Sequence, residues 1–219
     1  MPEISNDPRP VTGPFARLAI PITIRIGAYI EYCPTGVAMK LHIGSRKRTE
    51  GWKTLDITPG PEVDFTGDCR NLSNFADGSV EIIYASHVLE HVPYNYEMMK
   101  TLKEWFRVLK PGGTVMISVP DLETLCRLFV HPQITPKNRY TIMRMMFGGQ
   151  VDTHDFHCAG LDWNIMGTFL HEAGFTEIKR VSDFGLFQDT SELKYGGVPI
   201  SLNVTARKPD GSQSEQQDA

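Results

Sequence analysis

The sequence has few cysteines, no long hydrophobic run and no excess of positive charge. Its four cysteines, Cys33, Cys69, Cys126 and Cys158, are widely spaced and form no C-x-x-C pair. Neither a zinc ribbon nor a disulfide framework is therefore indicated, and we expect reduced thiols in a cytoplasmic protein. The formal net charge of −4 excludes the overall basic field that favours nucleic acid or an anionic membrane as a partner.

The N-terminal residues lack the pattern of a targeting signal. Residues 1–14 are polar and proline-rich, with acidic residues where a signal peptide carries positive charge. The apolar stretch at 18–30 is broken by Pro21 and Arg25 and is too short to span a bilayer. Its isoleucines recur at every second position, which favours a strand and leaves a short amphipathic helix open. We predict an N-terminal extension over residues 1–37.

Strand patterns recur from residue 39 onward. The runs MKLHI, VEIIYAS and TVMISVP are continuously apolar or nearly so, as in strands that are buried on both faces of a parallel sheet. In contrast, ISLNVTA at 200–206 alternates apolar and polar residues. This alternation predicts a half-exposed antiparallel strand, paired with TEIKRV at 176–181.

Helix patterns lie between these strands. Apolar residues recur with helical spacing at 95–110, and helices are also predicted at 136–147 and at about 162–173. Asp121 is placed to cap a further helix that runs to about Phe129. The sequence therefore predicts an α/β fold, a mostly parallel sheet with helices on both faces and a C-terminal antiparallel hairpin.

One motif points to a metal. The segment His87-Val88-Leu89-Glu90-His91 fits H-x-x-E-H, which on a helix places two zinc ligands beside a glutamate base. A third ligand would come from His154 or His157. However, the motif follows a buried strand, and Pro93 leaves no long helix to carry it. We therefore expect no metal and keep a zinc hydrolase as the remote alternative.

A glycine and an aspartate mark the first two strand ends. A nucleotide-type cofactor needs a glycine for close backbone approach and an acidic residue for the ribose hydroxyls, and Gly44 and Asp56 supply both. The chain has no G-x-G-x-x-G, and 12 positions separate the two residues, against about 20 in a dinucleotide-binding fingerprint. A simple turn glycine and a helix-capping aspartate remain the alternative reading.

Three segments together resemble a known family. HIGSRKRTEGWKTLDI, GDCRNLSNFADGSVEIIYASHVLEHVP and LKEWFRVLKPGGTVMISVPD are similar to successive motifs of class I S-adenosylmethionine-dependent methyltransferases. The subgroup they resemble is the methyltransferase type 11 proteins of bacterial polysaccharide-biosynthesis clusters. The resemblance covers about residues 39–125 and, more loosely, the chain to 208. It implies a Rossmann-like sheet of seven strands over 38–208. The last residues lack apolar anchors, which predicts a disordered tail over 209–219.

The resemblance also implies a cofactor, S-adenosylmethionine, and its contacts. The positions of this chain that match the family's cofactor-binding positions are His42, Gly44, Ser45, Arg46, Asp56, Asp68, Cys69, Ser86 and His87. Asp56 would bind the ribose hydroxyls, and the carboxylate of Asp68 would accept from the adenine amine. Arg46 stands where the family has a second glycine, so it either pairs with the cofactor carboxylate or lies in solvent. This departure leaves open a non-catalytic, methyltransferase-like partner module.

The acceptor side offers two histidines. An oxygen acceptor must lose a proton, and histidine is the side chain suited to accept it near neutral pH. His154 and His157 lie in the glycine-flanked segment GGQVDTHDFHCAG, and Asp155 between them is placed to orient an imidazole. We predict these as the catalytic residues, with His157 slightly favoured. The expected acceptor is a small molecule or a glycan, with no nucleic acid partner.

Overall fold

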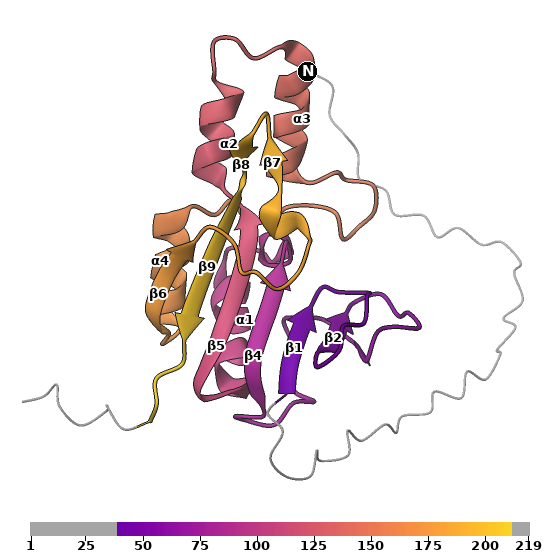
Figure 1. The fold of residues 1–219 in the computed structure, drawn as a ribbon, viewed down its shortest axis with the longest axis vertical. Helices are drawn as coiled ribbons and strands as arrows, with labels where there is room; N and C mark the ends of the chain where they lie inside the picture. The colour runs from indigo at the N-terminus through magenta and orange to yellow at the C-terminus, as the bar shows by residue number, and fades with distance from the viewer. Residues whose placement is uncertain (1–38, 212–219) are drawn as a thin grey trace, which may run out of the picture. The chain divides into compact units, whose positions relative to one another are not determined.

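The computed structural model describes residues 39–211, which form a large sheet with flanking helices and a separate two-stranded sheet of β7 and β8 (Figure 1). The strands are β1 (Met39–Ile43), β2 (Lys53–Asp56), β3 (Phe65–Thr66), β4 (Val80–Ser86), β5 (Leu109–Pro120), β6 (Thr176–Val181), β7 (Lys194–Tyr195), β8 (Val198–Pro199) and β9 (Ser201–Arg207). The helices are α1 (Tyr96–Val108), α2 (Leu122–Phe129), α3 (Pro136–Phe147) and α4 (Trp163–Glu172), with short 3-10 helices η1 (Leu89–His91) and η2 (Thr190–Glu192).

Some predicted segments lie outside the described residues. These are the N-terminal extension, with its strand or cover helix at 18–30, and most of the predicted C-terminal tail. Among the helices that the structure describes, each is too short or too polar to cross a membrane.

Seven strands form the main sheet, in the order β3-β2-β1-β4-β5-β9-β6. The pairs from β3 to β5 are parallel, and β9 runs antiparallel to β5 and β6. This confirms the predicted α/β fold and the antiparallel pairing of the last two strands. In register, Ile43 lies opposite both Leu55 of β2 and Ala85 of β4. The carboxyl ends of these strands therefore meet at one edge of the sheet.

The main core lies between one face of the sheet and the helices α1 and α4. Leu102 and Trp105 of α1 and Leu170 of α4 are fully buried there against strand residues such as Ile83. Complete burial of a large apolar side chain contributes about 1.5–3 kcal/mol, so these helices hold the sheet firmly. The other face carries a separate aromatic group, where the His42 ring lies 4.4 Å from that of Phe187.

The helix predicted at 95–110 ends close to its predicted end, but the strand that follows begins earlier than the run TVMISVP. The helix ends at Val108, but the next residues continue directly into β5, which begins at Leu109. A backbone hydrogen bond from Gly112 N to Lys208 O (3.0 Å) ties this segment to the C-terminal side of the sheet. Contacts with residues distant in sequence therefore extend β5 through residues 110–113.

Asp121 begins α2 as predicted, but its carboxylate does not cap the helix. Instead Oδ2 accepts hydrogen bonds from Arg180 Nη2 (2.7 Å) and Thr124 Oγ1 (2.9 Å). The helices α2 and α3 lie beyond the carboxyl ends of β4 and β5 (Figure 1). The loop that follows α3 returns from there toward the strand ends.

Candidate functional site

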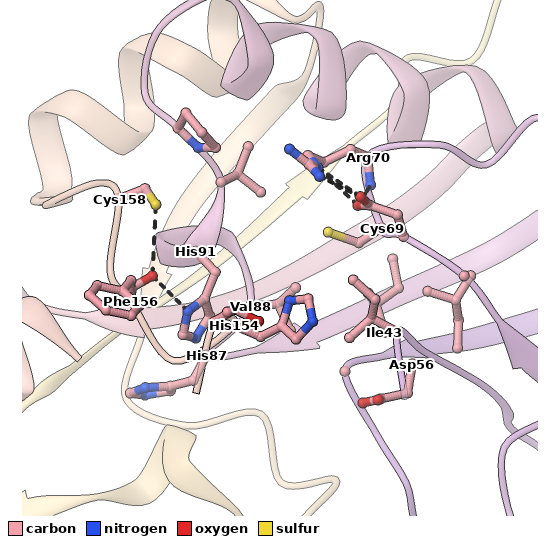
Figure 2. Close-up of a pocket in the computed structure, with 18 residues that line it drawn as sticks. Ile43, Asp56, Cys69, Arg70, His87, Val88, His91, His154, Phe156 and Cys158 are labelled. Atoms are coloured by element: carbon pink, nitrogen blue, oxygen red, sulfur yellow. Dashed lines mark hydrogen bonds and ion pairs between the residues drawn. The ribbon is translucent and has the colours of Figure 1, made fainter. Parts of the chain in front are cut away.

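A cavity of about 390 Å³ opens at the carboxyl ends of the parallel strands, where ligands bind in open α/β sheets. Its lining residues come from the ends of β1, β2, β3 and β4, from the segment around η1 and from the loop after α3. In Figure 2, Asp56, Cys69 and Arg70 lie on one side, His91 and Phe156 lie on the other, and His154 lies between them. The cavity is within the size range of small-molecule sites.

Gly44 follows β1 and lines the cavity. Its φ of +80° is the left-handed conformation that glycine adopts without strain. Gly44 N donates to Leu55 O (2.7 Å), which joins the end of β1 to β2. A Cβ at this position would overlap Cγ2 of Val88. Because Gly44 has no side chain, a ligand in the cavity can approach its backbone closely.

Asp56 lies at the end of β2 and is half-buried in the cavity wall. Its Oδ1 accepts a hydrogen bond from Thr58 N at 2.7 Å, which fixes the carboxylate in place. Since a carboxylate has about four acceptor positions, capacity remains for two vicinal hydroxyls. This geometry fits the role that the resemblance implies.

Asp68 and Cys69 lie in the wall as predicted, but Asp68 already has a cationic partner. Arg70 Nη2 donates to Asp68 Oδ2 (2.6 Å), and Arg70 Nη1 donates to Glu97 Oε2 (2.6 Å). Although partial burial raises the pKa of Asp68, the hydrogen bonds and charge of Arg70 hold it below its usual value. Burial raises the pKa of Cys69 to about 12, so its thiol stays protonated.

His87 follows β4 and also lines the cavity. Its φ is +53°, an uncommon conformation for a residue with a Cβ. The ring is held at both nitrogens, with Nε2 3.0 Å from Ser201 Oγ and Nδ1 3.3 Å from Glu90 Oε1. Such strained positions are concentrated at functional sites.

Four predicted cofactor contacts are not among the residues that line the cavity. The buried His42 packs among Tyr84, Phe187 and Trp52, and Ser86 Oγ contacts Asp189 and Thr190 at 3.3 and 3.1 Å. Both side chains alternate with core residues of their strands, so they extend from the opposite face of the sheet.

The other two, Ser45 and Arg46, lie in the loop after β1. Ser45 Oγ donates to Lys47 O (3.0 Å) and accepts from Lys47 N (3.2 Å), which stabilises a turn. Arg46 is exposed. Their contacts with the cofactor stay predictions.

The loop after α3 brings the predicted catalytic segment to the cavity. His154 lines the cavity, whereas His157 does not. Asp155 does not orient either imidazole, because its Oδ2 accepts from Val151 N (3.3 Å) and its carbonyl accepts from Gln150 N (3.1 Å). It stabilises the loop instead.

His157 is half-buried and lies behind the cavity wall. Its Nδ1 is 3.2 Å from Met146 O, and its ring centroid is 5.0 Å from that of His91. Burial lowers the pKa of His157, an effect that the charge of Glu90 partly opposes. The ring is therefore neutral near pH 7.

Sequence reasoning missed several residues of the cavity. His91, which the sequence offered only as part of the H-x-x-E-H motif, lines the cavity with Nδ1 3.0 Å from Phe156 O. Arg70 and Cys158 were not singled out, although both are neighbours in sequence of residues that were. Their adjacency to Cys69 and His157 is the signal that could have found them.

The strand order and the position of the cavity define the class. A sheet of order β3-β2-β1-β4-β5-β9-β6, with β9 antiparallel, is the α/β fold of class I methyltransferases. Residues 40–117 match the family model of the methyltransferase domain. Over this segment the chain is similar to methyltransferase domains of the class whose methyl donor is S-adenosylmethionine. No curated protein sequence matches the chain.

Solved structures share this fold at low sequence identity. A possible histamine N-methyltransferase from Thermotoga maritima aligns at TM-score 0.50 and 19% identity, over 80% of this chain and 84% of that chain. A SAM-dependent methyltransferase from Archaeoglobus fulgidus aligns at 0.51 and 15%, over 79% and 87%. A 1,6-didemethyltoxoflavin-N1-methyltransferase from Burkholderia thailandensis, solved with S-adenosylhomocysteine, aligns at 0.50 and 16%, over 79% and 72%.

Other similar structures are longer than this chain. The alignment spans 62% of an exported protein from Bordetella parapertussis and 50% of the CurJ carbon methyltransferase.

Proposed function

We propose that the protein transfers a methyl group from S-adenosylmethionine to a hydroxyl oxygen of a small molecule or sugar. The observation that carries the proposal is that Gly44, Asp56 and His154 line the same cavity. Gly44 allows close approach of a nucleoside and Asp56 can accept hydrogen bonds from its ribose hydroxyls. The imidazole of His154 can accept a proton from the acceptor hydroxyl. The cofactor and the acceptor thus have separate places in one site.

In the proposed reaction the acceptor oxygen attacks the methyl carbon of the sulfonium. A C–O bond forms, the S–CH₃ bond breaks with its electron pair passing to sulfur, and S-adenosylhomocysteine leaves. The acceptor proton passes to the imidazole of His154. Most of the rate enhancement comes from holding the two reactants in line.

His154 is assigned as the base because it lines the cavity, and its imidazole makes no hydrogen bond with another described residue. His157 is screened by the wall and has other contacts. Phe156, which is 46% exposed at the cavity, offers an aromatic surface beside the polar groups. A hydroxyl-bearing ring such as a sugar matches this combination.

The test is calorimetric titration of the purified chain with S-adenosylmethionine, followed by measurement of S-adenosylhomocysteine release with a panel of monosaccharides and nucleotide sugars. We expect saturable 1:1 binding and turnover with one member of the panel. Absence of binding by the folded chain would overturn the proposal and favour the non-catalytic module. Binding with turnover only on amines or thiols would overturn the oxygen acceptor.

A further inference from the structure

Three side chains form a cluster beside the cavity that the proposed reaction does not use. Ligand-type atoms of Glu90, His91 and His157 all lie within 4.8 Å of one another. Glu90 and His91 belong to η1, whereas His157 comes from the loop after α3. The cluster therefore joins two segments far apart in the sequence.

The loop is fixed to η1 by its backbone. The carbonyl of Glu90 accepts hydrogen bonds from both Cys158 N (2.7 Å) and Ala159 N (3.0 Å). His157 N also donates to Phe147 O at 3.2 Å. These contacts hold His157 against η1, so the three side chains are placed together by the fold rather than by a passing loop conformation.

Each imidazole has its Nδ1 against a backbone carbonyl, and no described residue forms a hydrogen bond with its Nε2. His91 Nδ1 lies 3.0 Å from Phe156 O, and His157 Nδ1 lies 3.2 Å from Met146 O. Because a carbonyl only accepts, each Nδ1 carries the proton, and each Nε2 keeps its lone pair. Metal-binding histidines are held in this way, with the second ring nitrogen donating to a backbone carbonyl.

The carboxylate of Glu90 is 1% exposed, and neither of its oxygens accepts a hydrogen bond from another described residue. Its nearest titratable neighbour beyond the cluster is His87, with Nδ1 3.3 Å from Oε1. A buried carboxylate without hydrogen bonds is costly unless a charged group compensates it. A divalent cation between Glu90 and the two free imidazole nitrogens would provide that compensation.

We propose that Glu90, His91 and His157 bind a divalent transition-metal ion of the zinc type. Two imidazoles and one carboxylate are a common three-ligand set for zinc and leave a fourth position open. Bonds of about 2.0–2.2 Å place tetrahedral ligands about 3.3 Å apart, so the cluster closes by small side-chain rotations. His91 also lines the cavity, which makes an acceptor oxygen the natural fourth ligand; this last step rests on the proposed function.

This ligand set differs from the one that the H-x-x-E-H motif suggested. There, His87 and His91 would be ligands and Glu90 a base. In the structure, the Nε2 of His87 is directed to Ser201, and His157 takes its place. The expectation of no metal rested on the absence of a long helix to carry the motif, whereas the proposed site needs only the short helix η1 and the loop that carries His157.

The test is titration of the full chain, purified without a histidine tag and treated with a chelator, with Zn²⁺ in the absence of S-adenosylmethionine. We expect one equivalent to bind, and at least about 100-fold weaker binding by Glu90→Gln and by His157→Ala. His131→Ala, which removes an exposed imidazole between α2 and α3, is the matched control and should bind as the unmodified chain does.

Thermal unfolding and S-adenosylmethionine titration of each variant check its fold. If Glu90→Gln fails to fold, the test rests on His157→Ala. His157 is half-buried and lies in a loop, so its removal should disturb the fold less than a change at the buried Glu90. Absence of stoichiometric Zn²⁺ binding, or unchanged binding by a folded variant, would overturn this inference alone. Zn²⁺ binding without S-adenosylmethionine binding would instead overturn only the proposed function.

Discussion

Gly44 and Val88 are in contact in the wall of the cavity, with no room between them for a side chain. A Cβ on Gly44 would overlap Cγ2 of Val88. The two residues follow β1 and β4, the neighbouring strands at the centre of the sheet. Their contact therefore determines how deeply a ligand can enter between the two strand ends.

Gly44→Ala is expected to weaken S-adenosylmethionine binding by at least tenfold. The added methyl meets Val88, and the φ of +80° costs a residue with a Cβ about 1–2 kcal/mol. Calorimetric titration measures the loss. The double variant Gly44→Ala/Val88→Ala relieves the contact but not the backbone strain, so it should recover part of the affinity. Equal affinity of all three proteins would contradict the role of this contact.

Asp56→Ala is expected to weaken S-adenosylmethionine binding by about 1.5–3 kcal/mol, the contribution of hydrogen bonds to a charged group. Since one oxygen already accepts from Thr58 N, the carboxylate is positioned before the ligand arrives. Titration calorimetry gives the difference. Glu50→Ala removes an exposed carboxylate from the loop between β1 and β2 and serves as the control. Unchanged affinity in a folded Asp56→Ala protein would remove the ribose assignment.

His154→Ala is expected to lower kcat by about 10²–10⁴-fold, the usual contribution of a positioned acid–base group. Cofactor affinity should stay within about twofold, because the proposed cofactor contacts come from other strand ends. Both quantities are measured, by S-adenosylhomocysteine release and by titration. A kcat within about threefold of the unmodified chain would mean that positioning alone accounts for catalysis.

His42 makes the fold sensitive to acid. Burial lowers the pKa of His42 from 6.5 to about 4, while the charge of Asp189 partly opposes the shift. The unfolded chain therefore binds a proton at a higher pH than the folded chain does. Stability is fully present above about pH 6.5 and falls between pH 6.5 and 4, by about 3 kcal/mol in total.

His42→Phe tests this linkage, because an aromatic ring is kept among Tyr84 and Phe187. Denaturant unfolding between pH 7 and 4 should show a smaller loss of stability than in the unmodified chain. His131→Gln changes an exposed histidine and should leave the loss as it was. Identical pH profiles of the His42 variant and the unmodified chain would contradict the prediction.

Sequence reasoning located those elements whose limits are local. VEIIYAS is β4 to the residue, and α3 spans 136–147 as predicted, because Pro136 and Gly148 fix its ends. The buried face of α1 was less certain from sequence. Trp105 is fully buried, while Phe106 is only half-buried, and adjacent aromatic residues give no clear helical phase.

The strand-end part of the site was predictable for a physical reason. In a parallel sheet the carboxyl ends meet at one edge, so Gly44, Asp56 and Asp68 could be placed in one cavity from their positions alone. That argument does not say from which face of the sheet a side chain extends. It therefore could not show that His42 lies on the face opposite the core. The cluster beside the cavity depends on hydrogen bonds from Cys158 N and Ala159 N to Glu90 O, which no local pattern encodes.

The left-handed backbone of His87 has a consequence for the sequences that this fold can accept. A non-glycine residue at φ +53° costs about 1–3 kcal/mol, which glycine or asparagine would largely avoid. The imidazole at this position contacts both Ser201 and Glu90, and neither glycine nor asparagine has two ring nitrogens to do so. A library of variants selected for heat resistance alone should therefore become rich in glycine or asparagine here. Selection for turnover should retain histidine, and the divergence between the two outcomes would measure how far stability and activity compete at one residue.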